Sequence, residues 1–270
     1  MSSPPFDERL RHIALKVARA KEHHAQLKQV LTTFIASNPY QIGTKRDPVT
    51  RRPTYYVAAA KPVPESVPLI AGDAIQNLMS GLDHLAYQLV CRDTSDQPPN
   101  PRWIYFPIAD DEPTYEAKKR DKMQGATDGT FSAIDALKPC KGGNDLLWSL
   151  YRLNNIEKHR LLLTVGAQAA GIHLGQLLSM HASGFSPEAV KALESMNHFL
   201  LPADTGFPIR GGFELYIGAP DEEVNPKLQF RFMVVLNEPG VAEGKPLLET
   251  IQALADEVER IVNVLVPRLK

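Results

Sequence analysis

The chain of 270 residues is long enough for one large domain or two small ones. Hydrophobic residues make up 43% and charged residues 23%, a globular balance that excludes a disordered chain, a collagen and a disulfide scaffold. The 30 Lys and Arg against 31 Asp and Glu give a net charge of −1, which disfavours coating of nucleic acid through bulk charge and leaves a local basic patch open.

Four long helices are predicted, because apolar residues recur at helical spacing over residues 6–37, 69–92, 144–160 and 245–269. The second has the narrowest apolar seam, with spacings of three and four between Ile75, Leu78, Leu82, Leu85 and Leu89. Asn144 is a suitable N-cap for the third helix. A short helix is also predicted over residues 115–123.

Strands are predicted between these helices. Residues 40–60 read as a β-hairpin, because Asp47-Pro48-Val49-Thr50 has a turn composition and strand-forming residues follow it. Residues 103–108 are expected to form a short strand, and residues 164–170 and 173–180 two strands joined by Gly171. Alternation of apolar and polar side chains predicts two more strands, at residues 213–217 and 228–236. The expected fold is α+β, with a helical bundle of about four long helices packed with a small antiparallel sheet.

The N-terminal residues lack the apolar core of a signal peptide, and no apolar stretch reaches the roughly 20 residues that span a bilayer. Cys91 and Cys140 lie far apart and have no metal-ligand spacing, so both are expected to be free thiols in a reducing compartment. A single disulfide between them is the less favoured alternative. We therefore expect a cytoplasmic protein with no membrane partner, no metal and no cofactor.

Two segments carry the most specific pattern. One runs from Gly72 to Tyr87 and includes Leu82-Asp83-His84; the other is Leu153-Asn154-Asn155-Ile156-Glu157-Lys158-His159-Arg160. Together they resemble a widespread group of uncharacterised bacterial proteins with a Gly-Asp…Leu-Asp-His helix and a later Lys-His-Arg motif. The resemblance covers roughly residues 8–162.

The first segment also resembles the Arg-x4-His signature of HEPN domains, helical bundles that are often dimeric and many of which are metal-independent ribonucleases. The expected organisation is a single α+β domain over residues 1–270, with a helical part at about 6–162 that resembles HEPN domains, a strand-rich insertion at about 163–238 and a closing helix at 245–269. The resemblance further implies RNA or a nucleotide as ligand, and a homodimer. His84 occupies the His position, but Met79 stands where the family has Arg, and a methionine cannot donate to a phosphate.

The candidate catalytic residues are His84 and His159, because a histidine can move a proton near neutral pH. The candidate binding residues are polar or charged groups near the two motifs and at the hairpin tip: Asp73, Asn77, Arg152, Asn155, Lys158, Arg160, Arg51 and Arg52. Lys158-His159-Arg160 has a second interpretation, as a basic last turn that complements the helix C-terminus.

Two functions from different classes follow. The first is RNA or nucleotide binding with a degraded ribonuclease site, and at best weak cleavage. The second is a non-enzymatic structural or interaction protein, in which the same polar residues form a buried network between two helices. Solvent access beside His84 separates them, because a pocket is open to water and a packing network is sealed.

Overall fold

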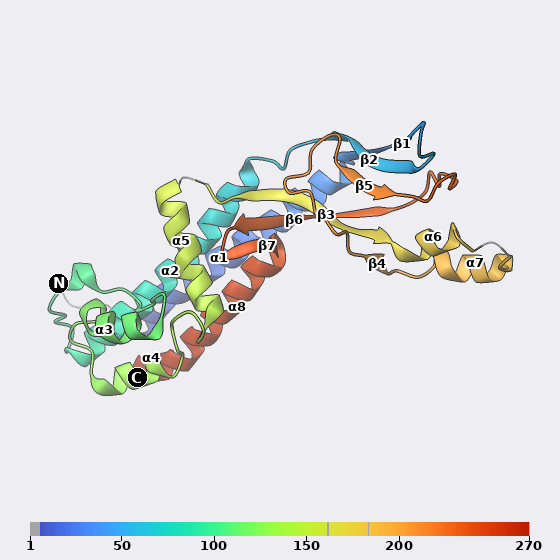
Figure 1. Ribbon diagram of the computed structural model, residues 1–270. Coiled ribbons are helices and arrows are strands. Elements are labelled where there is room, and N and C mark those ends of the chain that lie inside the picture. The colour runs from blue at the N-terminus through green and yellow to red at the C-terminus, as the bar shows by residue number, and fades with distance from the viewer. Residues whose placement is uncertain (1–5, 161, 183, 270) are drawn as a thin grey trace. The chain divides into compact units, whose positions relative to one another are not determined.

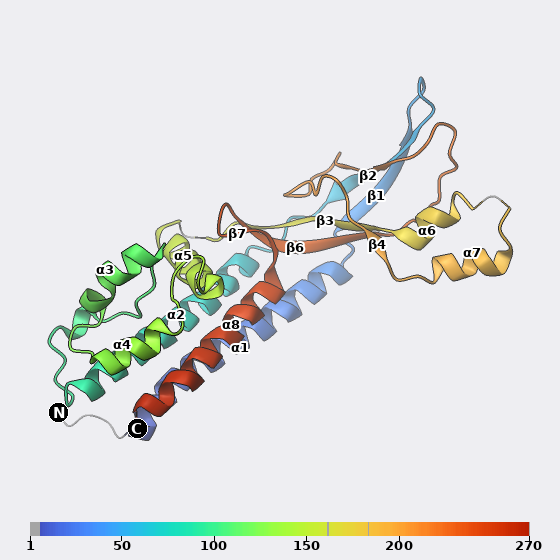
Figure 2. The same cartoon turned by 60° about the horizontal axis from the view of Figure 1, so that its bottom comes forward.

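The computed structural model describes residues 6–160, 162–182 and 184–269, and Figures 1 and 2 show its elements in two views. The chain divides into two compact units. Unit 1 comprises residues 1–30, 65–164 and 237–270, and unit 2 comprises residues 31–64 and 165–236. Long helices dominate unit 1 and antiparallel strands dominate unit 2, so the predicted α+β class is confirmed. The expected single domain with an insertion stays a prediction.

The helices of unit 1 surround α2. The elements in chain order are α1 (Phe6–Ala36), whose part up to Val30 belongs to this unit, α2 (Ser66–Asp93), η1 (Pro101–Trp103), α3 (Glu112–Lys122), α4 (Asp128–Asp135), α5 (Asp145–Arg160), β7 (Ala242–Pro246), α8 (Leu247–Leu265) and η2 (Val266–Leu269). The α2 helix packs against α5 and α8, and Figure 2 shows α1, α2 and α8 running alongside one another. The four long helices predicted from apolar spacing are therefore present.

The predicted seam of α2 is the core of this bundle. Leu78, Leu82 and Leu85 are fully buried, and burying a leucine side chain contributes roughly 2 kcal/mol. At Gly81 the α1 helix is a neighbour, since a β-carbon there would lie 3.5 Å from the β-carbon of Lys16. That is an ordinary van der Waals distance, so a methyl group at this position would contact α1 without displacing it.

Unit 2 contains two small antiparallel sheets. Its elements are β1 (Tyr40–Arg46), β2 (Pro53–Ala60), β3 (Val165–His173), α6 (Leu174–Ser179), α7 (Pro187–Glu194), β4 (Phe199–Leu200), β5 (Glu214–Ile217) and β6 (Phe230–Glu238), the last crossing the unit boundary at residue 236. One sheet has the order β1-β2-β5, and in the other β3 lies between β4 and β6. Val57, Ala169 and Leu215 form a buried cluster from β2, β3 and β5, so the sheets share a core.

Two predicted strands are wrong. Residues 103–108 form the end of η1 and an irregular segment. In the segment 173–180, residues Leu174–Ser179 form α6 instead of a strand. The β3 strand continues through Gly171 to His173, whose imidazole Nδ1 accepts a hydrogen bond from the Gln176 N–H (3.1 Å). That bond caps a helix where apolar residues alone suggested a strand.

The sequence analysis also missed two short helices, α4 and α7. Each begins with a hydroxyl N-cap: Thr127 accepts from the Thr130 N–H, and Ser186 accepts from the Ala189 N–H. The α7 helix has only eight residues, none of them buried, and a segment this short is difficult to identify from helical spacing of apolar residues.

Both cysteines are free and buried, as expected. Within the described residues, no helix combines the length and the apolar character needed to cross a membrane.

Candidate functional site

The helices that carry the two motifs, α2 and α5, pack against each other. Gly72 lies at this contact, because a β-carbon there would lie 3.0 Å from Cγ of Glu157, and the Glu157 side chain would have to shift to accommodate it. Asn144 starts α5 as predicted, with its side-chain oxygen accepting a hydrogen bond from the Leu147 N–H (3.0 Å). The glycine of the first motif therefore has a packing role.

Among the side chains that the structure describes, no hydrogen bond joins Asp73 or Asn77 of the first motif to Arg152, Asn155 or His159 on α5. The Asn77 side chain donates to the backbone oxygen of Asp73 on its own helix (2.8 Å), and the Asp73 side chain is exposed. Arg152 lies 3.6 Å from the carboxylate of Asp110, which also accepts from the indole N–H of Trp148 (2.9 Å). The physical reason is that α2 meets α5 through the small residue Gly72, and Asn77 satisfies its side chain within its own turn.

His84 faces α1. It is exposed at the surface, and its pKa lies below the ordinary value because of desolvation, with further lowering by the nearby charges of Lys16 and His12. Lys16 lies beside Gly81, and His12 is one helical turn from Lys16 on α1. His12, Lys16 and His84 therefore lie on one accessible face formed by α1 and α2.

His159, the second candidate catalytic histidine, lies on α5. His159 is exposed in the last turn of α5 and is not among the charged groups that act on His84. Asn155 is half-buried, and Lys158 is exposed. Arg160 closes α5, and its side chain lies outside the described residues. The two candidate catalytic histidines thus form no common centre in this chain.

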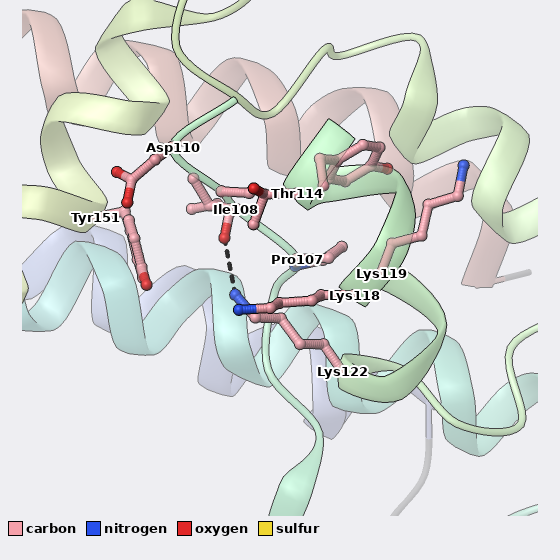
Figure 3. A pocket seen from close by; sticks show the side chains of 10 residues that line it. Pro107, Ile108, Asp110, Thr114, Lys118, Lys119, Lys122 and Tyr151 are labelled. Carbon is pink, nitrogen blue, oxygen red and sulfur yellow. Dashed lines mark hydrogen bonds between the residues drawn. The ribbon is translucent and has the colours of Figure 1, made fainter. Parts of the chain in front are cut away.

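A pocket of about 120 Å³ opens between α3, α5 and the segment before α3, and Figure 3 shows its lining. The Lys118 and Lys122 side chains extend in the same direction, with their ammonium ends below the carbonyl of Ile108, while Lys119 points away. Lys122 donates to that carbonyl (2.7 Å) and lies over the ring of Tyr151 (5.2 Å). The ammonium group of Lys119 is held by Glu116 and Asp135 instead.

The two cations of this pocket affect each other. Burial lowers the pKa of Lys122; the carboxylate of Asp83 opposes this shift and the ammonium group of Lys118 adds to it. Asp83 is itself largely buried and accepts a hydrogen bond from the Phe106 N–H (3.0 Å). Burial raises the pKa of Asp83 to about 6, against the opposing effects of that hydrogen bond, Lys158 and Lys122. The structure thus places a desolvated carboxyl group and the ammonium group of Lys118 near Lys122, with opposite effects on its pKa.

The basic hairpin tip of unit 2 is bonded internally. Arg51 is exposed, and its guanidinium pairs with Asp221 (2.7 Å). Arg52 donates to the backbone oxygen of Gly218 (2.8 Å). Each of these two candidate binding residues therefore has a partner within the unit.

The sequence analysis missed Lys118, Lys122 and Tyr151. A signal was present, because Lys118 and Lys122 are four apart on a predicted helix and like charges at this spacing repel each other. Such a pair persists most easily where water or a bound anion offsets the repulsion.

A search of family models, curated proteins and solved structures finds no match to this chain, so the function is argued from its own residues.

Proposed function

We propose that this protein binds the phosphate groups of RNA or of a nucleotide, and that it cleaves RNA weakly or not at all. The observation that carries the proposal is the pair of ammonium groups, Lys118 and Lys122, that line one small pocket. A bound phosphate would lie near both cations and reduce their mutual repulsion, which is the arrangement that favours an anion.

The pocket offers neutral groups as well as charge. The hydroxyl groups of Thr114 and Tyr151 lie in its lining, and a hydroxyl can donate a hydrogen bond to a phosphate oxygen. The nearest carboxylate in the lining, Asp110, already accepts from Trp148 and lies beside Arg152. These contacts compensate its charge, so it repels an anion less than a free carboxylate would.

The absence of efficient cleavage rests on Met79 and His84. Met79 is 5% exposed and packs in the core of unit 1, so the family position for a phosphate-binding cation is filled by an apolar side chain. Desolvation and the charges of α1 lower the pKa of His84, which reduces its protonated fraction near neutral pH. A missing electrostatic contact to the transition state commonly costs a hundredfold or more in rate.

The experiment measures the affinity of the full-length protein for a fluorescently labelled single-stranded RNA by anisotropy over a series of salt concentrations. We expect Lys118→Gln plus Lys122→Gln to weaken binding at least tenfold and to reduce the slope of log affinity against log salt by about two. Lys21→Gln is the matched control, because Lys21 is a cation on α1 that pairs with Glu259 (2.7 Å).

Unchanged RNA affinity in the double variant would show that the pocket is not the contact. Loss of binding in Lys16→Gln plus His84→Gln, with the pocket variant unaffected, would move the phosphate contact to the α1–α2 face. No binding of RNA or of a mononucleotide by the wild-type protein would refute the proposed function.

The structural alternative has one observation in its favour. Asn144 at the start of α5 donates to Glu257 of α8 (2.6 Å), and Glu257 also pairs with Arg260 (2.7 Å). This network positions α5 on the bundle. If Asn144→Ala lowered stability while the pocket variants changed neither RNA nor nucleotide binding, the structural function would be the better explanation.

A further inference from the structure

Unit 2 has a hollow of its own, with a volume of about 400 Å³, between β1, β4, β6 and the end of α1. Pockets of roughly 300 to 1,000 Å³ are the usual size for small-molecule sites. The side chains that define its chemistry are four aromatic rings and one cation: Tyr40, Phe199, Phe230, Phe232 and Arg231. The hollow therefore combines an apolar wall with a positive charge.

Three of the rings lie near one another. Tyr40 and Phe232 lie with their ring centres 4.5 Å apart and tilted by 42°. Phe230 and Phe232 share one face of β6, and Arg231 between them lies on the other face with Phe199, so the hollow borders both faces of this strand. Desolvation raises the pKa of Tyr40 to about 12, so its hydroxyl stays neutral and the wall adds no negative charge.

Arg231 is held in place by Phe199. The carbon of its guanidinium group lies 4.0 Å from the centre of the Phe199 ring, a stacked contact that fixes the plane of the guanidinium. The position of Phe199 depends on Gly171, which pairs with Arg231 across the sheet. A β-carbon at Gly171 would lie 2.6 Å from the β-carbon of Phe199, so a larger residue would displace the ring.

The charge of Arg231 is uncompensated. Its side chain is exposed, and across the described part of the chain no carboxylate lies within ion-pair distance of it. Lys45 and Arg51 in the same unit, by contrast, pair with Glu214 and Asp221. A planar guanidinium beside an aromatic wall, with its charge free, can bind an aromatic ring and an anionic group together.

We propose that this hollow binds a small planar aromatic anion, whose carboxylate or phosphate pairs with Arg231 and whose ring packs against aromatic side chains that line the same hollow. This ligand class includes aromatic carboxylates and mononucleotides. The proposal does not depend on the lysine pocket, because all residues that carry it belong to unit 2.

The test measures binding to the full-length protein by isothermal titration calorimetry with two probes, 2-naphthoate and adenosine monophosphate. Their neutral counterparts, 2-naphthol and adenosine, test the need for the anionic group, and inorganic phosphate tests the need for the ring. We expect at least one anionic aromatic probe to bind, and each neutral counterpart and phosphate to bind at least tenfold more weakly than its anionic probe.

Arg231→Gln is expected to weaken binding of that probe at least tenfold, while Lys227→Gln, an exposed cation just before β6, leaves it unchanged. Lys118→Gln plus Lys122→Gln should also leave binding of 2-naphthoate unchanged. If only the double lysine variant loses binding of adenosine monophosphate, the nucleotide binds in the lysine pocket of the proposed function. That outcome counts against the hollow of unit 2 as the nucleotide site.

Binding of 2-naphthoate alone would assign an aromatic carboxylate, and binding of adenosine monophosphate alone, if sensitive to Arg231→Gln, would assign a nucleotide. The proposal is overturned if neither probe binds at millimolar concentration. It is also overturned if Arg231→Gln, with a circular dichroism spectrum like that of the wild type, binds equally well, or if inorganic phosphate binds as tightly as the aromatic anions.

Discussion

Asp83 gives the sharpest test of the electrostatics beneath the lysine pocket. Its carboxylate is desolvated on α2 and its pKa is raised from 3.8 to about 6. Such a shift corresponds to about 3 kcal/mol of free energy that folding loses when the group is ionised. Asn at this position has the same shape, can still accept the hydrogen bond from the Phe106 N–H and carries no charge.

The sign follows from proton binding. Between about pH 4 and pH 6 the folded protein holds a proton on Asp83 that the unfolded chain has released, so the contribution of this group to stability falls as the pH rises through that window. Asp83→Asn removes this loss. We therefore expect the variant to be more stable than the wild type at pH 7 by roughly 1–3 kcal/mol, less at pH 5, and without advantage below pH 4. The loss of a partner for Lys122 and Lys158 reduces the gain.

The assay is urea unfolding followed by tryptophan fluorescence at several pH values. The two tryptophans, Trp103 and Trp148, both lie in unit 1 together with Asp83, so the fluorescence reports on the right part of the chain. Asp73→Asn is the matched control, because it removes an exposed carboxylate from the same helix. The reasoning is refuted if Asp83→Asn is no more stable than the wild type at pH 7, or if Asp73→Asn gives the same pH-dependent gain.

Three further changes test the described contacts. Asp93→Ala should lower the free energy of unfolding by about 3 kcal/mol in urea titrations. The Asp93 side chain is 1% exposed and accepts a hydrogen bond from the Thr130 hydroxyl (2.6 Å), and that buried hydroxyl loses this acceptor in the variant. Met79→Arg should lower it by about 3 kcal/mol or more, because the charge enters the core; RNA cleavage by this variant that His84→Ala abolishes would instead indicate a dormant ribonuclease site. Arg51→Ala should cost less than about 1 kcal/mol in thermal melts and leave RNA affinity unchanged, because Arg51 and Asp221 are each 64% exposed; a tenfold loss of affinity would assign the hairpin tip to the RNA contact.

The fold was predictable where one physical effect dominates a long segment. The seam of α2 consists of leucines at spacings of three and four, and burial of that seam determines the helix. The hairpin of β1 and β2 was predictable because its turn composition separates two strand-forming segments. The change from β3 to α6 was not, because the apolar residues after His173 suit either structure and a single side-chain cap decides between them.

The candidate site was less predictable, because its chemistry depends on contacts between distant segments. The motif on α2 identified His84 as a candidate residue. Its charged neighbours, His12 and Lys16, lie on α1, so the spacing of residues within the motif could not predict them. In the same way, the sequence shows Lys122 only as one of several lysines in a charged helix. Its surroundings, the ring of Tyr151 on α5 and the carbonyl of Ile108, come from other segments of the chain.

The same reasoning separates the cations of this protein by what surrounds them. Arg51 and Lys119 are paired with carboxylates, so their charge serves the fold. Lys118 and Lys122 share one pocket, where Asp83 and Asp110 partly offset the charge of Lys122. Arg231 stacks on a ring and has no carboxylate within ion-pair distance among the described residues. With 30 basic and 31 acidic residues in the sequence, net charge disfavours binding through bulk charge and locates no site. The two proposed sites follow instead from two lysines that share a pocket and from an arginine that stacks on a ring.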